Sequence, residues 1–302
     1  MKRVAISIGD LNGIGVELAL ANHHIIKEMV EPLYVIDDEM LQRASNLLEI
    51  EIPIDFKTTS PKAKLFEITP STISAMSGAY SYASFVEAVA LAREGKVDAI
   101  VTLPIHKKAW EEAGVEYKGH TDALRDFFKA DAIMMLGCEE MFVALYTEHI
   151  PLKDVASSIN AKDLSRFLVD FYRAIKPTQR VAVLGLNPHA GDGGVLGDEE
   201  RIITQAIDNA HKILKTTIFS SPLVPDVAFT PHIRANYKYY IAMYHDQGLA
   251  PLKALYFDEG INISLNLPIL RTSVDHGTAF DRAYRGADIS PLSYINAVGY
   301  II

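Results

Sequence analysis

The stretch VAVLGLNPHAGDGGVLGDEE, residues 181–200, combines a strand, a loop and a helix start. It opens as an apolar run typical of a buried strand, passes through Asn187, Pro188 and His189, and ends in acidic residues that favour a helix N-terminus. The loop between contains Gly191, Gly193, Gly194 and Gly197. A plain connection needs only a few residues with one turn-former. The stretch therefore predicts an α/β fold with a ligand-binding loop.

The same alternation extends outward over the chain. Apolar, β-rich runs predict strands at 4–10, 33–38, 99–104, 132–138, 141–147, 180–186 and 239–245. Segments with apolar residues three and four positions apart predict helices at 16–29, 81–95, 107–114, 121–130, 161–175, 199–215 and, closing the chain, 291–302. Strands that alternate with helices indicate a layered α/β protein.

Length and composition limit the possible classes of protein. A chain of 302 residues is longer than one core usually supports, so we expect two domains. The net charge of −9 disfavours a nucleic-acid surface. Cys138 is the only cysteine, which excludes an internal disulfide and a cysteine zinc cluster. Gly9 and Asp10 interrupt the first apolar run, and no segment reaches about 18 unbroken apolar residues. We expect a cytoplasmic protein that does not bind membranes.

Polar residues gather where predicted strands end, which is where open α/β sheets bind ligands. The segment SIGDLNGIGVE, residues 7–17, has glycines at a spacing that fits neither the dinucleotide fingerprint nor a P-loop. It is equally compatible with a simple turn. Thr121 follows Gly119 and His120 at a predicted helix start, where it could cap the helix or help bind an anion.

Three histidines each follow a predicted strand: His149, His189 and His245. Their imidazoles would suit a Lewis-acid metal such as Zn²⁺, Co²⁺ or Mn²⁺ if the fold or a second subunit brought them together. No local metal motif links them, so each could equally be a general base or a core residue.

The segment 249–285 contains Lys253, Asn262 and Arg271. A cation, an amide and a guanidinium suit a carboxylate or phosphate ligand. The two cations could instead lie on a solvated face. Their apolar neighbours, LAPLKAL and LPILRTS, favour partial burial with an anionic partner.

Five motifs together carry a resemblance: GDLNGIG followed by Glu17, KGHTD, LNPHAGDGG, YHDQGLAPLK and LPILRTSVDHGTAFD. In this order they are similar to the 4-hydroxythreonine-4-phosphate dehydrogenase family of pyridoxal phosphate (pyridoxine) biosynthesis. The resemblance implies two α/β/α domains with a cleft between them, like isocitrate and isopropylmalate dehydrogenases and unlike a Rossmann fold. It implies a first domain of 1–130 with 272–302. Residues 131–271 would form the second, with most metal ligands and a homodimer interface.

The resemblance also implies roles for individual residues. The metal ligands would be His149, His189 and His245, one of them donated by the other subunit of a homodimer with shared active sites. The metal would be zinc, cobalt, magnesium or manganese. Substrate contacts would be His120, Thr121, Lys253, Asn262 and Arg271, with Asp226, His120 and Lys253 as candidate catalytic residues. Contacts to NAD or NADP would be His276, Gly277, Thr278, Ala279 and Asp281.

The implied activity is that of an oxidoreductase. It would oxidise and decarboxylate 4-phosphohydroxy-L-threonine to 3-amino-2-oxopropyl phosphate. Relatives acting on another phosphorylated hydroxy acid, such as a four-carbon sugar acid phosphate, remain an alternative, as do a metal-dependent hydrolase and an inactive metabolite-binding protein. The chain departs from the family pattern at Leu11, Asn12, Val16, His106 and Asp122, none of which is a proposed ligand.

Overall fold

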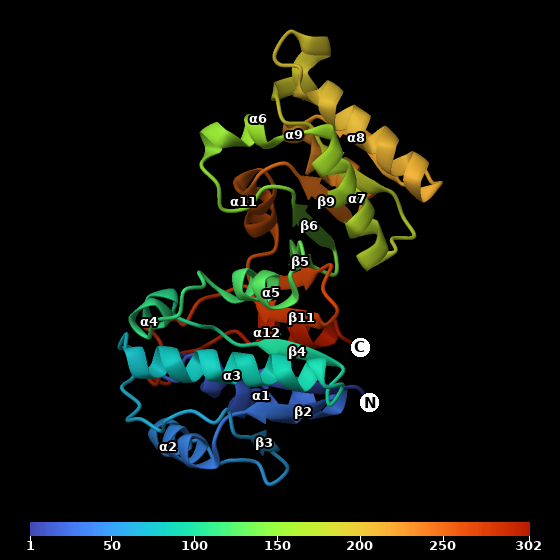
Figure 1. The fold of residues 1–302 in the computed structure, drawn as a ribbon. Coiled ribbons are helices and arrows are strands. Elements are labelled where there is room, and N and C mark those ends of the chain that lie inside the picture. The colour runs from blue at the N-terminus through green and yellow to red at the C-terminus, as the bar shows by residue number, and fades with distance from the viewer. The chain divides into compact units, whose positions relative to one another are not determined.

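The computed structural model describes residues 1–302, which divide into two compact units (Figure 1). Unit 1 comprises Met1–Ala130, Ile261–Ile263 and Leu267–Ile302, and unit 2 comprises Asp131–Gly260 and Ser264–Asn266. Each unit has a sheet with helices on both faces, so the predicted α/β class is confirmed.

The sheet of unit 1 is parallel. Its strands lie in the order β3 (Thr58–Thr59), β2 (Glu31–Val35), β1 (Arg3–Ser7), β4 (Ala99–Thr102) and β11 (Leu270–Val274). Strand β10 (Ile261–Leu265) contributes residues to both units. Because parallel neighbours need long crossover connections, helices separate most of these strands in the sequence.

Helices cover both faces of this sheet. Helix α3 (Ala75–Arg93) packs on β1, β2 and β4 and against α4 (Lys107–Glu112), beside α5 (His120–Phe128). Its face of the core includes Ala5, Ile100, Phe85 and Trp110. Side chains of a strand alternate between faces, so Tyr34 points the other way and contacts His23 of α1. There α1 (Gly15–Met29) packs against α12 (Leu292–Gly299), and α2 (Asp38–Leu48) follows β2.

Unit 2 has a mixed sheet in the order β5 (Ile133–Cys138), β6 (Met141–Leu145), β9 (Tyr239–Ala242), β7 (Val181–Leu184) and β8 (Phe219–Leu223). Strands β5 and β6 form an antiparallel hairpin, and the other neighbours are parallel. Helix α11 (His245–Leu255) packs on β6 and β9 through Leu249 and Leu252. On the opposite face, Phe171 of α7 (Ala161–Ile175) contacts Tyr239, and α7 packs against α8 (Glu199–Leu214).

Shorter elements of unit 2 carry the remaining segments. They are η1 (Leu152–Asp154), α6 (Val155–Ser158), η2 (Pro188–Gly194), α9 (Pro225–Ala228) and α10 (Pro231–Arg234).

The structure contains every predicted strand and helix, with small differences at the ends. The first strand stops at Ser7, because Gly9 has a φ of 75° and turns the chain before Asp10. The sequence analysis missed α2, β8, β10, β11 and α11, together with the short elements β3, η1, α6, η2, α9 and α10. It took the segments of β10 and β11 as a binding motif, and Gly248 with Pro251 concealed the helix α11.

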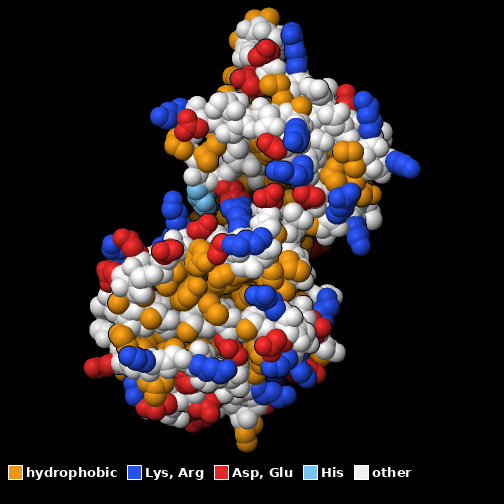
Figure 2. Space-filling model, in the orientation of Figure 1, with side chains coloured by type: hydrophobic (Ala, Val, Ile, Leu, Met, Phe, Trp, Pro, Cys, Tyr) orange, Lys and Arg blue, Asp and Glu red, His pale blue; other side chains and the backbone are white.

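Charged side chains of both signs are spread over the visible face of the molecule. Lys and Arg side chains are interspersed with Asp and Glu over the face drawn in Figure 2. None of the helices combines the length and apolar character needed to cross a membrane.

Gly78 allows the backbone of α4 to approach α3. A Cβ atom built on Gly78 would lie 2.0 Å from the Ala109 carbonyl oxygen. Replacing a helical glycine by alanine ordinarily gains about 1 kcal/mol of helix propensity. Here the contact with rigid backbone outweighs that gain, because the two helices would have to separate.

We expect Gly78→Ala to lower the free energy of unfolding by about 1–3 kcal/mol, measured by urea denaturation. Gly299→Ala is the matched control in α12, where a Cβ would meet only the flexible Met29 Cε at 3.4 Å. That variant should be neutral or slightly more stable. Equal stability of both variants would show that α3 and α4 are not held at this distance.

Asp10 is a buried carboxyl at the turn that follows β1. Its Oδ1 accepts the Asn12 N–H at 3.0 Å and its Oδ2 accepts the Ser77 hydroxyl at 3.3 Å. Burial raises the pKa of Asp10 from 3.8 to about 6, because the charged form loses hydration, and the two hydrogen bonds offset only part of this rise. The folded protein therefore holds a proton at Asp10 at pH values where the unfolded chain has lost it.

This raised pKa has a defined sign for stability. The stabilising contribution of protonated Asp10 to the free energy of unfolding is fully present below about pH 4. It is lost as the pH rises from about 4 to about 6. Asp10→Asn keeps an acceptor for Asn12 and removes the buried charge. It should raise the free energy of unfolding at pH 7.5 by about 2–3 kcal/mol, with little gain at pH 4. The exposed Asp98→Asn, which also keeps an acceptor for a backbone N–H, is the control. A gain for Asp10→Asn that is independent of pH would contradict this explanation.

Candidate active site

Arg271 forms the centre of a buried polar cluster in unit 1. Its side chain is on β11 and the residue is 2% exposed. The guanidinium donates from Nε and Nη2 to the Thr102 hydroxyl, at 3.1 and 2.7 Å, and from Nη1 to the Asn262 amide oxygen at 3.3 Å. Burial lowers the pKa of Arg271, although a guanidinium stays protonated at any physiological pH. A cation in such surroundings attracts an anion strongly, because charges are poorly screened there.

His120 is the first residue of α5 and belongs to the same cluster. The rings of Phe85 and Trp110 meet the imidazole edge-on at centroid distances of 4.7 and 5.3 Å. Burial, together with the charge of Arg271, lowers the pKa of His120 well below its ordinary value, so the ring is neutral. Its buried Nε2 has no hydrogen-bond partner. A buried polar atom without a partner is costly, and a polar ligand would satisfy it.

The start of α5 excludes one of the two interpretations of Thr121, that of a helix cap. Gly119 precedes the helix as its N-cap, and Thr121 is the second helical residue, so Thr121 is not the cap. Thr121 is buried beside His120, where the first N–H groups of a helix favour an anion. Unit 1 thus brings together His120, Thr121, Asn262 and Arg271. The sequence analysis missed Thr102, although a threonine at the end of a buried strand was an available signal.

Two of the three predicted metal ligands lie together in unit 2. The rings of His149 and His245 have a centroid distance of 5.5 Å. The Nδ1 of His245 bonds the Asp246 carboxylate at 2.7 Å, which leaves Nε2 as the ring nitrogen facing other partners. His189 does not complete the pair, and the chain holds no group of three or more His, Cys, Asp or Glu arranged for a metal. Two of the three expected imidazole ligands therefore lie close together in this chain, and imidazole nitrogens suit a metal such as zinc.

His189 occupies the loop η2, whose backbone is left-handed from His189 to Gly194, with φ values between 44° and 103°. Glu200 of α8 holds the start of this loop: its Oε1 accepts the N–H groups of Leu186 and Asn187 at 2.8 and 2.7 Å. A Cβ on Gly191 would lie 2.6 Å from the Glu200 Oε2. Gly191 is therefore required for packing, whereas Gly193 faces open space. The helix of Asp226, α9, packs against this loop and leaves Asp226 exposed.

The predicted cofactor residues form a turn-rich segment after β11. The Nδ1 of His276 lies 3.1 Å from the Gly277 carbonyl oxygen, and its Nε2 is buried without a partner. Burial lowers the pKa of His276. Thr278 is buried, Gly277 has no atom within 4 Å of a built Cβ, and Asp281 is exposed. The Ile14 N–H donates to the Thr278 carbonyl at 3.1 Å, so the GDLNGIG turn supports this segment.

Lys253 lies in the last turn of α11, with its Nζ 5.9 Å from the centre of the Phe257 ring.

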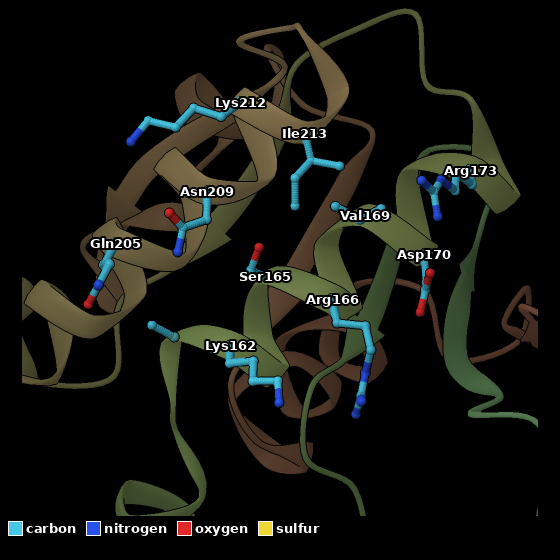
Figure 3. A pocket seen from close by; sticks show the side chains of 11 residues that line it. Lys162, Ser165, Arg166, Val169, Asp170, Arg173, Gln205, Asn209, Lys212 and Ile213 are labelled. Carbon is cyan, nitrogen blue, oxygen red and sulfur yellow. The ribbon is translucent and has the colours of Figure 1, made fainter.

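A separate groove runs between α7 and α8 (Figure 3). Its walls include the cations Lys162, Arg166, Arg173 and Lys212. None of the predicted site residues lines it.

Comparisons with known proteins show the family to which this chain belongs. Residues 28–301 match the family model described as pyridoxal phosphate biosynthetic protein PdxA. A 4-hydroxythreonine-4-phosphate dehydrogenase of Sulfurimonas denitrificans is 60% identical over 98% of this chain and 95% of its own length. The crystal structure of the enzyme of that name from Klebsiella pneumoniae superposes with a TM-score of 0.82 at 32% identity, over 100% of this chain and 99% of its own. An isocitrate dehydrogenase from Methylococcus capsulatus shares the fold, with a TM-score of 0.51 at 13% identity over 100% of this chain and 85% of its own. The chain belongs to the PdxA family of pyridoxal phosphate biosynthetic proteins.

Proposed function

We propose that this chain is a metal-dependent 4-hydroxythreonine-4-phosphate dehydrogenase. It would oxidise 4-phosphohydroxy-L-threonine with NAD⁺ or NADP⁺ and release carbon dioxide, giving 3-amino-2-oxopropyl phosphate. The observation that carries this proposal is the 60% identity over almost the whole chain to a protein of that name. The buried polar cluster around Arg271 in unit 1 adds support, because the substrate is an anion.

Arg271, His120, Thr121 and Asn262 are proposed to bind the substrate. A guanidinium is suited to a phosphate or carboxylate because it presents several N–H donors in one plane. The neutral His120 can share a hydrogen bond through its unpartnered Nε2. Lys253 is proposed as a further contact to the anion. Its residue type fits that role, and its place at the end of a helix makes it less buried than Arg271.

His149, His189 and His245 are proposed as the metal ligands. The closeness of His149 and His245 supports the pair, and a third imidazole from a second subunit would complete the set. Imidazole donors favour Zn²⁺ or Co²⁺ over Mg²⁺, which prefers oxygen. When bound, the metal would supply Lewis acidity, which eases loss of the hydroxyl proton and stabilises negative charge during decarboxylation.

The protein must also accept a proton when the substrate hydroxyl becomes a ketone. The hydride passes to the nicotinamide, and the hydroxyl proton passes to a base of the protein. The lowered pKa of His120 makes it a weak base, which favours Asp226 or Lys253 for this role. The β-keto acid then loses carbon dioxide, and a proton is returned to the carbon that carried the carboxylate.

The dinucleotide is proposed to bind at His276, Gly277, Thr278, Ala279 and Asp281. Three features of that segment support the assignment: the buried unpartnered Nε2 of His276, the open space at Gly277, and the exposed carboxylate of Asp281. A backbone that leaves space for a ligand and offers polar atoms is what a cofactor contact requires.

A homodimer is proposed to complete the site. Three exposed apolar side chains of unit 2 follow proposed site residues along the chain: Leu152 comes after His149, Val195 after the loop of His189, and Phe257 after Lys253 at the end of α11. These residues are 70%, 79% and 71% exposed. Apolar groups of this size near a functional site are typical of a surface that a partner covers. A second copy of the chain would supply both the cover and a ligand.

The alternative substrate is another phosphorylated hydroxy acid, such as a four-carbon sugar acid phosphate. The buried polar cluster around Arg271 would accept either substrate, because both carry a phosphate and a carboxylate. Formation of reduced nicotinamide from a panel of such acids separates the two possibilities, and its absence with all of them would favour a hydrolase or a binding protein.

Metal dependence gives the first test of the site. We expect His149→Ala, His189→Ala and His245→Ala each to stay folded, to lose bound metal, and to lower turnover at least about 100-fold. Metal content is measured by elemental analysis alongside absorbance of the reduced cofactor. His232→Ala, an exposed histidine in α10, is the control and should keep both. A ligand variant with full metal content would remove that histidine from the site.

Shared sites give a second test. Two inactive variants altered at ligands donated to one site by opposite subunits should regain part of the activity when mixed, because a mixed dimer has one intact site. The three pairwise mixtures of the histidine variants identify which ligand crosses the interface. Failure of all three mixtures, with subunit exchange verified by mass spectrometry, would contradict a shared site.

A further inference from the structure

The segment that follows β11 has no regular secondary structure until α12 begins at Leu292. Its position in unit 1 therefore depends on individual contacts. The GDLNGIGVE turn and its neighbours supply several of them. The Ile14 N–H donates to the Thr278 carbonyl at 3.1 Å, and the Ser71 hydroxyl donates to the Phe280 carbonyl. Gly13 lets the turn approach, because a Cβ there would lie 2.8 Å from the Thr278 Cβ.

Tyr284 connects the far end of this segment to the GDLNGIGVE turn. Its hydroxyl donates to the Leu11 carbonyl oxygen at 2.6 Å. Burial raises the pKa of Glu17, and the neighbouring Tyr284 backbone offsets part of that rise, which indicates that the Tyr284 backbone lies near the Glu17 carboxylate. Burial raises the pKa of Tyr284, so the phenol stays protonated and remains a donor. Its backbone is left-handed, with a φ of 60°, a conformation that a tyrosine adopts only when its surroundings hold it.

A short turn links Tyr284 to the proposed cofactor contacts. The N–H groups of Arg282 and Ala283 both donate to the Ala279 carbonyl, at 2.8 and 3.0 Å. Ala279 is itself left-handed, with a φ of 43°. Residues 279–283 are therefore one internally bonded turn. Tyr284 follows this turn directly, so its bond to the Leu11 carbonyl oxygen restricts the orientation of Ala279 and Thr278.

We propose that Tyr284 is a positioning residue for the dinucleotide. Through its hydroxyl bond to Leu11 and its backbone contact with Glu17 it holds residues 276–281 in the conformation that receives the cofactor. The inference rests on the proposed cofactor role of these residues. A segment already held in its binding conformation loses less conformational freedom on binding, so its affinity is higher. Glu17 acts with Tyr284 through the contact between its carboxylate and the Tyr284 backbone.

The test is direct dinucleotide binding, measured with purified full-length protein by NADH and NADPH fluorescence in the absence of substrate. Tyr284→Phe removes only the hydroxyl and should raise the dissociation constant about fivefold, the effect of one lost hydrogen bond. The KM for the cofactor should rise in parallel, whereas the KM for the phosphorylated substrate should stay within about twofold of the original. Glu17→Ala should raise the dissociation constant as well, and Glu17→Gln, which keeps an acceptor oxygen, should restore most of the affinity.

Tyr80→Phe is the matched control. Tyr80 is a buried tyrosine of unit 1 whose hydroxyl bonds Asp37, away from the segment. It should lower the melting temperature and leave the dissociation constant unchanged. Tyr284→Phe with normal dinucleotide affinity, whatever its melting temperature, overturns the inference. Absence of NADH and NADPH binding in the unaltered protein overturns the proposed cofactor, and with it the basis of the inference.

Discussion

The buried guanidinium of Arg271 is the constraint on which the polar part of unit 1 depends. Removing a cation from water costs several kcal/mol unless hydrogen bonds satisfy it. In the parallel register, Arg271 pairs with Ile100 and Ser273 pairs with Thr102, so the arginine reaches along the sheet to the threonine at the end of the next strand. This geometry places a positive charge at the carboxyl end of β4 and keeps the neighbouring His120 neutral. A buried positive charge of this kind would favour an anion as the ligand of the proposed site.

Periodicity predicted the fold where the apolar pattern was undisturbed. Strands β4 and β7 are fully buried, and helices α7 and α8 have one apolar stripe each, so all four were evident in the sequence. Strands β10 and β11 were missed because polar site residues, including Asn262 and Arg271, interrupt their alternation. Helix α11 was missed because Gly248 looked like a helix breaker. In the structure Gly248 serves packing, since a Cβ would lie 2.4 Å from the Val143 Cγ1 of β6.

The site residues were predictable by type, and their grouping was not. Lys, Arg, His and Asn near strand ends stood out in the sequence, yet nothing local showed that Arg271 bonds Thr102 and Asn262. The proposed metal ligands show even more clearly that the sequence does not reveal which residues lie together. His149 and His245 are 96 positions apart in the chain and meet only because β6 and β9 are neighbours. Sequence spacing carries no information about a ligand that a second chain would supply.

The loop η2 has a consequence for the local stability of unit 2. Three of its left-handed residues, His189, Ala190 and Asp192, carry a Cβ, and each such residue costs about 1–2 kcal/mol relative to a right-handed one. Hydrogen bonds to Glu200 hold the loop at its start. The glycines that follow have no side chains with which to add further contacts. The loop therefore stores conformational energy at the position of a proposed ligand. A ligand bound at His189 would therefore offset part of the conformational cost of this loop, and the local stability of the loop should rise when the proposed site is occupied.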